Sequence, residues 1–220
     1  MIDQVASSAL FKIGGKIIIT HTIVWTWIIM LFIILLAIFV RVNLRLVPKN
    51  NVQNMIEMLI ALIKNMVVSM MGEEGMFYFP LVATIAIFVV ISNIISTIPT
   101  FRSPTADLNT TFAFGFVVFL VAQTSGLVVK KWVYIKGYFE PIFLWFPLNI
   151  IGELGKLVSH SFRLFGNIVG GTIIVIIMGQ LFGQYAIPGL LNAWFGVIVG
   201  IIQAFVFFIL AVAYIMVQIK

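Results

Sequence analysis

The sequence predicts an all-α integral membrane protein with five membrane-crossing helices and one interfacial amphipathic helix. Of its 220 residues, 62% are hydrophobic and only 9% are charged, whereas a soluble domain carries about 25% charged residues. The net charge of +6 fits the excess of Lys and Arg in the cytoplasmic loops of membrane proteins. Because no soluble domain is present to hold a basic surface, we expect this single membrane domain, residues 1–220, to meet the lipid bilayer and no nucleic acid.

The first membrane span is predicted over residues 17–40, an apolar run long enough to cross a hydrocarbon core of about 30 Å. Trp25 and Trp27 lie near its start, as interfacial anchors often do. The run is too long for a signal-peptide core and lacks a small-residue cleavage site, so we expect it to be retained. The segment 41–49 that follows is basic, which marks that side of the membrane as cytoplasmic.

Residues 52–71 predict the amphipathic helix at the interface. Glu57 and Lys64 lie in the middle of the segment on one helix face, while Met55 and Leu62 lie on the other. Two charges in the middle of an apolar segment favour a helix that lies in the interface over one that spans.

The positions of the basic loops support that assignment. Segments 41–49 and 130–136 are both basic and should share the cytoplasmic side. An even number of crossings must therefore separate them, and the apolar runs 77–98 and 110–129 supply two, as a helical hairpin. A third crossing by residues 52–71 would place the two basic loops on opposite sides.

The loop between the two helices of that hairpin contains Asp107 and Asn109. These residues stand at the start of a helix, where Asp and Asn cap free backbone N–H groups. Alternatively, they form a polar mouth on the non-cytoplasmic side of the membrane. The sequence leaves both readings open.

Two long helices close the chain, over residues 141–182 and 190–219, with a turn at 183–188. At 1.5 Å per residue, about 35 helical residues cover roughly 50 Å, which is more than a perpendicular crossing needs. We expect both helices to be strongly tilted and to pair as an ion-path hairpin. Pro147 should kink or break the first of them. Five crossings place the N-terminus outside and the C-terminus in the cytoplasm.

A polar stripe runs along the first of these long helices, although apolar sequence surrounds it. Its members recur every three or four residues and fall within about 80° of one helix face. They are Asn149, Glu153, Lys156, His160, Arg163 and Asn167. One face of this helix is therefore expected to meet something polar.

Arg163 requires an anion that the chain itself does not offer. An arginine in the middle of a span costs at least about 2.5–3.5 kcal/mol, and such residues usually mark a pathway or pair with a partner. Glu153 lies about 15 Å away along the helix axis, and Lys156 can neutralise it instead. No other predicted span carries a carboxylate in its interior. The anion should come from another chain or from a transported ligand.

Three stretches of sequence resemble one known family. Residues 161–167 (SFRLFGN), preceded by 151–154 (IGEL), resemble the signature of subunit a of F-type ATP synthases. Residues 104–109 (PTADLN) and 203–205 (QAF) match the other two marked stretches of that family, in the same order and spacing. The likeness covers nearly all of the chain from the first span onward.

The resemblance implies a stator subunit in a bacterial cell membrane, beside a ring of c subunits and held by peripheral stalk b subunits. In that family the arginine lies between two aqueous half-channels and faces the ion-binding carboxylate of the ring, which assigns this role to Arg163. Further candidates for the lining of the ion path are polar residues on the same segments. They are Asn167, Gln203, Thr172, Asn192, Asp107, Asn109, Glu153, Lys156, Ser159 and His160.

The coupling ion stays open between H+ and Na+. Many proton-driven relatives carry an ionisable pair nine residues after the arginine and seven before the glutamine, where this chain has Thr172 and Gly196. Neither can exchange a proton, whereas Na+ needs only oxygen ligands and room. Protons could still pass through water, and selectivity depends mainly on the ring. No metal site is predicted beyond a transient Na+.

An alternative function is a self-contained secondary transporter that binds an anionic substrate at Arg163. Such carriers usually show internal repeats with paired broken helices, and the two halves of this chain are dissimilar. The sequence also lacks a GxxxxGK[ST] phosphate loop. We therefore expect no cofactor and no enzymatic activity of the chain alone, with the nucleotide chemistry of the complex on its partners.

Overall fold

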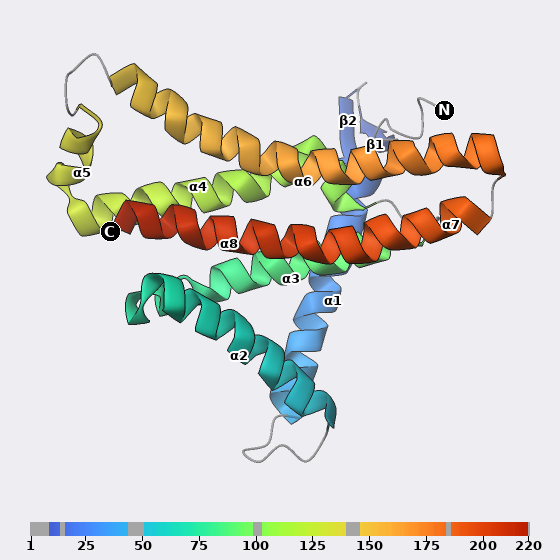
Figure 1. Cartoon of the computed structure of the whole chain (residues 1–220), viewed down its shortest axis with the longest axis horizontal. Coiled ribbons are helices and arrows are strands. Elements are labelled where there is room, and N and C mark those ends of the chain that lie inside the picture. Colours follow the sequence, from blue (N-terminus) through green and yellow to red (C-terminus); the bar gives the residue numbers. More distant parts are fainter. Residues whose placement is uncertain are drawn as a thin grey trace.

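The structure is a computed structural model that describes residues 9–13, 16–43, 51–98, 103–139, 146–183 and 186–219 (Figure 1). Helices make up nearly all of it, which confirms the all-α class. The elements, in chain order, are β1 (Ala9–Ile13), β2 (Lys16–Thr20), α1 (His21–Asn43), α2 (Asn51–Met71), η2 (Glu73–Phe77), α3 (Phe79–Ile95), η3 (Pro104–Ala106), α4 (Leu108–Lys130), α5 (Trp132–Gly137), α6 (Phe146–Phe182), α7 (Ala186–Ala193), the π-helical η5 (Trp194–Val199) and α8 (Gly200–Ile219).

A short antiparallel pair of strands, β1 and β2, precedes the first helix and was not expected from the sequence. The first span was predicted from residue 17, but β2 continues to Thr20 and α1 begins at His21. The run KIIIT in β2 is rich in β-branched residues, which favour a strand where a partner strand is available. Apolar content alone did not distinguish these residues from the helix that follows.

The layer that carries the polar stripe consists of α3, α4, α6 and α8. Helix α8 packs against α3 and α4, and α4 packs against α6. Their shared core is aliphatic and aromatic, with Val89 of α3, Val118 of α4, Leu164 of α6, and Phe207 and Val212 of α8 among its members. These side chains have at most 2% of their surface exposed.

Helix α6 is 37 residues long, or about 55 Å at 1.5 Å per residue. It runs beside α7 and α8, whereas α1 runs across this long hairpin (Figure 1). Because α1 and the hairpin lie across each other, both cannot stand along one membrane normal. A membrane that α1 crosses upright would hold α6 strongly tilted, in keeping with the sequence-based expectation.

Two prolines lie near the described ends of the hairpin helices. Pro147 is the second residue of α6 as the structure describes it, so the predicted kink or break there stays a prediction. Residues 141–145 of the predicted helix lie outside the described residues. Gly183, with φ of 93°, ends α6 in the left-handed conformation that glycine adopts readily. The expected turn is shorter than 183–188, because Pro188 already belongs to α7.

The last helix starts at Ala186, four residues before its predicted start, and is interrupted by the π-helical η5. Such π-segments insert one residue into the α-helical register and often occur at functional sites. Gly196 is buried within η5. A Cβ on this residue would meet the backbone oxygen of Asn93 at 3.3 Å and would collide with the Thr97 hydroxyl. The π-segment therefore brings a bare backbone against α3.

Five helices of the described residues are long and apolar enough to cross a membrane. The number equals the predicted one, but the set differs. Residues 53–71 of α2 meet the criterion of length and composition, whereas α3, with 17 residues, is shorter than the other candidates. At about 26 Å, α3 still lies near the lower limit for a span. The interfacial placement of α2 stays a prediction.

Candidate functional site

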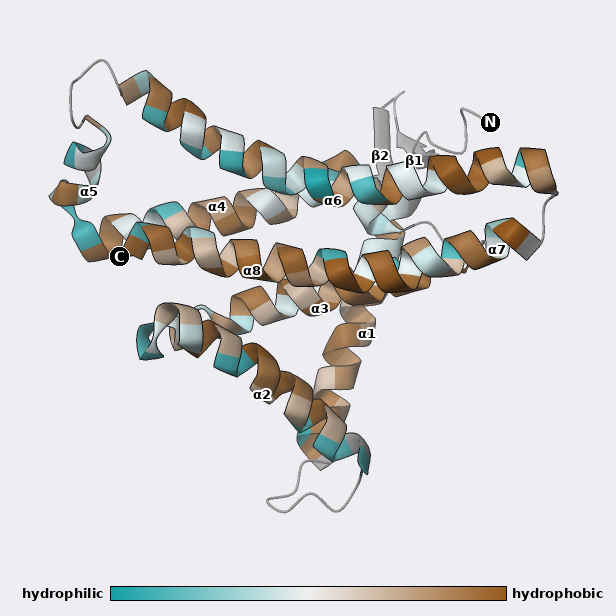
Figure 2. Cartoon of the chain, viewed as in Figure 1, coloured by the Kyte–Doolittle hydropathy of each residue, from teal (hydrophilic) through white to brown (hydrophobic). Residues whose placement is uncertain are grey.

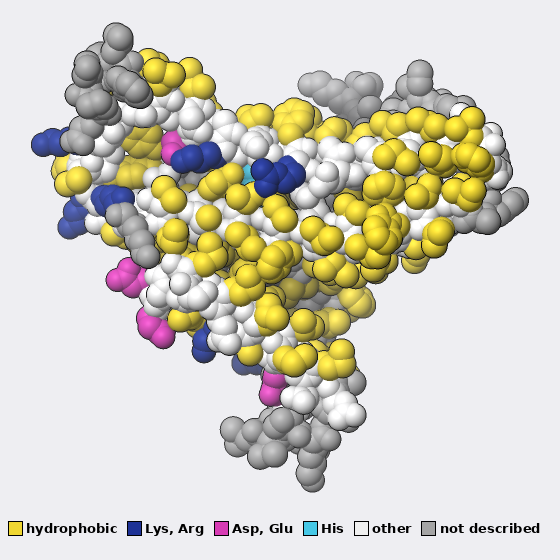
Figure 3. Space-filling model, in the orientation of Figure 1, with side chains coloured by type: hydrophobic (Ala, Val, Ile, Leu, Met, Phe, Trp, Pro, Cys, Tyr) yellow, Lys and Arg dark blue, Asp and Glu magenta, His cyan; other side chains and the backbone are white. Residues whose placement is uncertain are grey.

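Arg163 lies on the exposed side of α6, in the middle of the long hairpin. Among the described residues, the only ion pair joins Lys156 to Glu153, so Arg163 has no carboxylate partner there. Apolar side chains are also exposed on the outer surfaces of the two helices, including Phe162 of α6 at 50% and Phe205 of α8 at 46%. Figure 3 shows charged side chains in the middle and toward the α5 end of this face, with hydrophobic side chains over the α7 end.

The polar stripe straddles the edge of the buried face of α6. Arg163 and Asn167 are exposed, whereas His160 retains only 2% exposure and faces the other helices. Figure 2 shows polar residues along the first half of α6 and a strongly hydrophobic C-terminal end. The stripe thus presents Arg163 and Asn167 outward, leaves Lys156 partly exposed and turns His160 toward the interior of the bundle.

Asn167 and Gln203, both predicted neighbours of the arginine, meet across the hairpin. The Asn167 amide Nδ2 donates a hydrogen bond of 2.5 Å to Gln203 Oε1. Gln203 is 4% exposed and sits on α8. This bond fixes α6 and α8 to each other one helical turn from Arg163.

His160 packs between aromatic rings of α8. Its ring centroid lies 3.9 Å from that of Phe207 and 5.5 Å from that of Tyr214. Its Nε2 atom is buried and has no hydrogen-bond partner in the described part of the chain. An unpaired buried nitrogen is costly, by about 1–3 kcal/mol.

Glu153 joins three helices through its carboxylate. Oε1 accepts a hydrogen bond from Lys156 Nζ at 2.5 Å, and Oε2 accepts from the amides of Gln123 at 3.1 Å and Gln218 at 2.9 Å. Gln123 belongs to α4 and Gln218 to α8. The sequence predicted Glu153 and Lys156 as a pair, which the structure confirms, but it did not identify Gln218.

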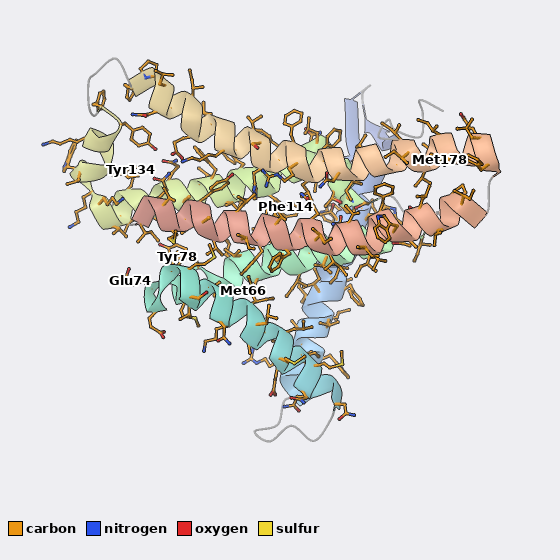
Figure 4. The ribbon with its side chains drawn as sticks, in the orientation of Figure 1. Met66, Glu74, Tyr78, Phe114, Tyr134 and Met178 are labelled. Carbon is orange, nitrogen blue, oxygen red and sulfur yellow. The ribbon has the colours of Figure 1, made fainter. Side chains whose placement is uncertain are left out.

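Two tyrosines extend this network at the α5 end of the bundle (Figure 4). The hydroxyls of Tyr134 and Tyr138 both donate to Gln123 Oε1 and lie 2.9 Å from each other. Burial raises the pKa of the Tyr134 hydroxyl, and the hydrogen bond with Tyr138 and the charge of Glu153 raise it further. This phenol therefore stays neutral at any physiological pH.

A cavity of about 610 Å³, here called the α5-end cavity, opens beside this network. Its lining includes two lysines, two tyrosines and the carboxylate of the network. The residues are Lys130, Val133, Tyr134, Gly137, Tyr138, Leu148, Asn149, Gly152, Glu153, Lys156 and Gln218. Asn149 also donates to the backbone oxygen of Tyr138 at 2.9 Å, which holds α6 to the segment after α5.

A second, much smaller space of about 10 Å³, here called the inner cavity, lies deeper in the bundle. It is lined by residues of α4, α6 and α8. They are Gly115, Phe119, Ala122, Glu153, Lys156, Leu157, His160, Tyr214 and Gln218. Glu153, Lys156 and Gln218 line both cavities.

The remaining predicted residues lie away from Arg163 or use their polar atoms locally. Asp107 caps α4, accepting from Asn109 N at 3.0 Å and from Thr22 Oγ1 at 2.9 Å, so the cap reading is confirmed. Thr172 is exposed and bonds its own helix at Ile168 O. Asn192 of α7 donates to Thr97 O at 2.8 Å. Ser159 and Asn109 are exposed.

A buried cluster of neutral polar groups lies where α3 and η3 meet the start of α8. Asn93 Nδ2 donates to Gly200 O at 3.0 Å, and Asn93 Oδ1 accepts from Thr105 Oγ1 at 2.9 Å. Ser103 donates to Ser92 O at 3.1 Å. Asn93 therefore joins α3 to α8 and to η3, and the contribution of η3 was not visible in the sequence.

No three His, Asp or Glu side chains gather into a metal-binding group within the described ranges. What remains distinctive is Arg163, an exposed cation without a carboxylate partner among the described residues, one helical turn from the Asn167–Gln203 bond that joins α6 to α8. The sequence model for the family described as ATP synthase A chain matches residues 23–216. The chain belongs to the ATP synthase subunit a family. It is therefore a multi-pass membrane protein.

Individual relatives in this family agree along most of their length. The chain is 40% identical to ATP synthase subunit a of Desulfosudis oleivorans over 212 residues, which covers 93% of this chain and 92% of the relative. It is 41% identical to ATP synthase subunit a of Geobacter sulfurreducens over 197 residues, covering 88% and 85%. With ATP synthase subunit a of Trichlorobacter lovleyi it shares 39% identity over 199 residues, covering 89% and 85%.

Proposed function

We propose that this chain is the stator subunit a of a rotary F-type ATP synthase. Arg163 separates two aqueous half-channels that carry ions to and from the carboxylates of a ring of c subunits. The observation that carries the proposal is the exposure of Arg163 on an apolar face without a carboxylate partner among the described residues. A charge in that position needs an anion from another chain.

The mechanism follows from electrostatics. As a ring carboxylate approaches Arg163, the positive charge favours its ionised form and displaces the bound cation into one half-channel. The same charge repels a cation that would leak directly between the half-channels. Each translocated charge draws about 2.3 kcal/mol per 100 mV of membrane potential, and ring rotation transmits this work. Arginine suits the role because it stays charged in a poor dielectric.

The bond between Asn167 and Gln203 positions the arginine relative to α8. Arg163 and Asn167 are one helical turn apart, and Gln203 anchors Asn167 from a buried position. The outer surfaces of both helices are apolar beside them, as a face that a ring helix covers would be. Exposed residues there include Phe162, Ile173, Ile174 and Ile177 on α6 and Ile201, Ile202 and Phe205 on α8.

The two half-channels start from opposite ends of the hairpin. The α5-end cavity, with Glu153 and Lys156 in its wall, supports a cytoplasmic entrance. On the other side, Asp107, Asn109 and Asn192 supply polar groups near the start of α4 and the end of α7. Thr172 adds a hydroxyl on the exposed side of α6 between that end and Arg163.

The partners proposed for this chain are the c-ring, the peripheral stalk b subunits and the remaining subunits of the complex, in a bacterial cell membrane. The N-terminus lies outside and the C-terminus in the cytoplasm, with α2 at the cytoplasmic interface. The chain alone is not an enzyme, and ATP chemistry belongs to the catalytic head. The translocated ion stays open between H+ and Na+. Thr172 and Gly196 stand where many proton-driven relatives carry an ionisable pair, and neither offers a titratable group. No observation favours a self-contained transporter.

Replacement of Arg163 tests the proposal. Arg163→Ala should abolish ATP-driven ion pumping by the complex in vesicles, while ATP hydrolysis by the detached head survives. Arg163→Lys should also fail, because a compact ammonium loses the broad fork of donors and its charge more readily. Arg41→Ala, at the exposed end of α1, is the matched control and should pump normally. Normal pumping by either Arg163 variant would end the proposal.

A further inference from the structure

The inner cavity adjoins the α5-end cavity and reaches His160. Three residues line both spaces, namely Glu153, Lys156 and Gln218, so the two cavities meet at the same side chains. His160 lines only the inner cavity and lies one helical turn before Arg163. The route passes through the interior of the bundle, between α4, α6 and α8, and leaves the exposed face of α6 untouched.

The inner cavity is the size of a single water molecule. A space of about 10 Å³ is close to the roughly 10–15 Å³ that one water needs, provided that polar partners surround it. Glu153, Tyr214 and Gln218 supply such partners in the wall. The buried Nε2 of His160, which lacks a partner among the described residues, completes the set.

We propose that His160 is a proton-exchanging residue at the inner end of a proton path that enters through the α5-end cavity, which rests on the proposed stator function. A proton passes from the water of the inner cavity to the lone pair of His160 Nε2, and that water regains a proton from the Glu153 side. From Nε2 the proton passes on to a ring carboxylate that has reached Arg163, one helical turn away, and the same steps in reverse carry a proton from the ring to the α5-end cavity. The path within this chain therefore ends one turn from Arg163.

The groups that face the imidazole support exchange over permanent charging. On α6, Glu153 and Lys156 neutralise each other, and Arg163 carries a positive charge one helical turn away. On α8, Tyr214 is the one titratable group in the cavity wall, and α4 contributes only Gly115, Phe119 and Ala122. An imidazole with a free lone pair can accept and return a proton, which is what a relay requires.

A purely structural role is the competing explanation, because the imidazole also packs on Phe207 at 3.9 Å. The two roles make different predictions for three substitutions. His160→Phe keeps an aromatic ring against Phe207, His160→Gln keeps a polar group, and His160→Gly leaves space for a diffusible imidazole. All three remove the titratable group, and only the last can regain one.

The experiment measures passive proton conduction through the assembled membrane sector, in vesicles from which the catalytic head has been stripped. His160→Phe and His160→Gln should each lower conduction at least about tenfold, the lower end of effects expected for a positioned proton-transfer group. Added imidazole should restore conduction to His160→Gly and leave the wild type unchanged. Phe207→Leu, which loosens the packing but keeps the imidazole, should retain most of the conduction.

Several outcomes would overturn the relay. Conduction at the wild-type rate in His160→Gln would do so. Equal losses of conduction in Phe207→Leu and in His160→Gly, with no rescue by imidazole, would also do so, because that pattern indicates a role in packing alone. If the His160 variants do not assemble, Ala122→Val keeps the histidine and narrows the inner cavity, because Ala122 lines that cavity and not the α5-end cavity. Normal conduction by that variant refutes a water path there.

The stator role and the relay fail separately. Loss of pumping in Arg163→Ala with normal conduction in His160→Gln leaves the stator role intact and removes only the relay. Sodium pumping by the intact complex that the His160 variants do not change would do the same. Normal pumping in Arg163→Ala would instead remove the proposed function itself.

Discussion

Glu153 offers the clearest test of how the polar network holds the hairpin together. Glu153→Gln keeps the size of the side chain but replaces one carboxylate oxygen with an NH₂ group, which can only donate. In the native chain both carboxylate oxygens accept, one from Lys156 and the other from the amides of Gln123 and Gln218. The new NH₂ group therefore faces at least one donor, either the Lys156 ammonium or the two glutamine amides, and that hydrogen bond is lost.

The expected loss can be estimated from these bonds. Hydrogen bonds to a charged group contribute about 1.5–3 kcal/mol each in buried settings. The ion pair with Lys156 is worth less, since that lysine side chain is 38% exposed. Discounting for this exposure, we expect a total destabilisation of about 2 kcal/mol, which corresponds to a shift of roughly 4–8 °C in a chain of this size.

The assay is the temperature at which the chain is lost from the detergent-solubilised complex, followed on native gels. The double variant Glu153→Gln with Gln218→Glu moves the carboxylate to the opposite helix and should recover part of the loss, because the new acid can accept from the amides around it. Ser159→Ala, on an exposed position of the same helix, is the control. An unshifted dissociation midpoint in Glu153→Gln would refute the assigned network. A double variant whose loss of stability equals the sum of the losses in the two single variants would refute it as well.

Three further predictions concern other parts of the chain. Gly196→Ala should destabilise the complex by about 1–3 kcal/mol through overpacking against Asn93 and Thr97. The control Gly170→Ala, which faces open space, should leave the dissociation midpoint unchanged. Equal midpoints for the two variants would contradict the close approach of η5 to α3. Cysteines at positions 57 and 64 of α2 should both react with an impermeant thiol reagent from the cytoplasmic side only, and labelling from opposite sides would show that α2 spans. The coupling ion can be decided by measuring ATP hydrolysis by the intact complex over a sodium titration at fixed pH, together with ²²Na uptake into vesicles. Stimulation of hydrolysis by sodium, with ²²Na uptake that survives a protonophore, establishes Na+. Hydrolysis that does not respond to sodium at any pH excludes Na+.

The sequence predicted those features of the site that depend on spacing along one helix. The stripe from Asn149 to Asn167 was visible because a 3.6-residue period places its members on one side, and Lys156 pairs with Glu153 three residues away as expected. The absence of a carboxylate within reach of Arg163 was likewise a local inference. These inferences needed only the geometry of α6 and the composition of the other predicted spans.

Features that depend on contacts between distant segments could not be predicted in this way. Gln218 bonds Glu153 from 65 residues away, and nothing in its own neighbourhood distinguishes it from a polar residue at a helix end. The π-segment η5 and the approach of Gly196 to Thr97 arise from packing against α3. The strand β2 formed because β1 lies beside it, which an apolar count of residues 17–40 does not detect.

The division of the stripe between two sides of α6 has a physical consequence for its chemistry. In the proposed stator, Arg163 acts at the exposed side, where a permanent charge is compensated only when another chain supplies a carboxylate, so its effect on that carboxylate rises and falls as the ring moves. The carboxylate of Glu153 is mostly buried, at 18% exposure, and the half-exposed Lys156 neutralises it, which leaves the interior with little net charge. A neutral, hydrogen-bonded interior can hold water without attracting a fixed counter-ion, whereas a second unpaired charge there would compete with the ring for Arg163. In the proposed stator, the pairing of Glu153 with Lys156 therefore keeps the arginine available to the ring. We expect the loss of Lys156 to lower pumping even though this lysine does not meet the ring carboxylate.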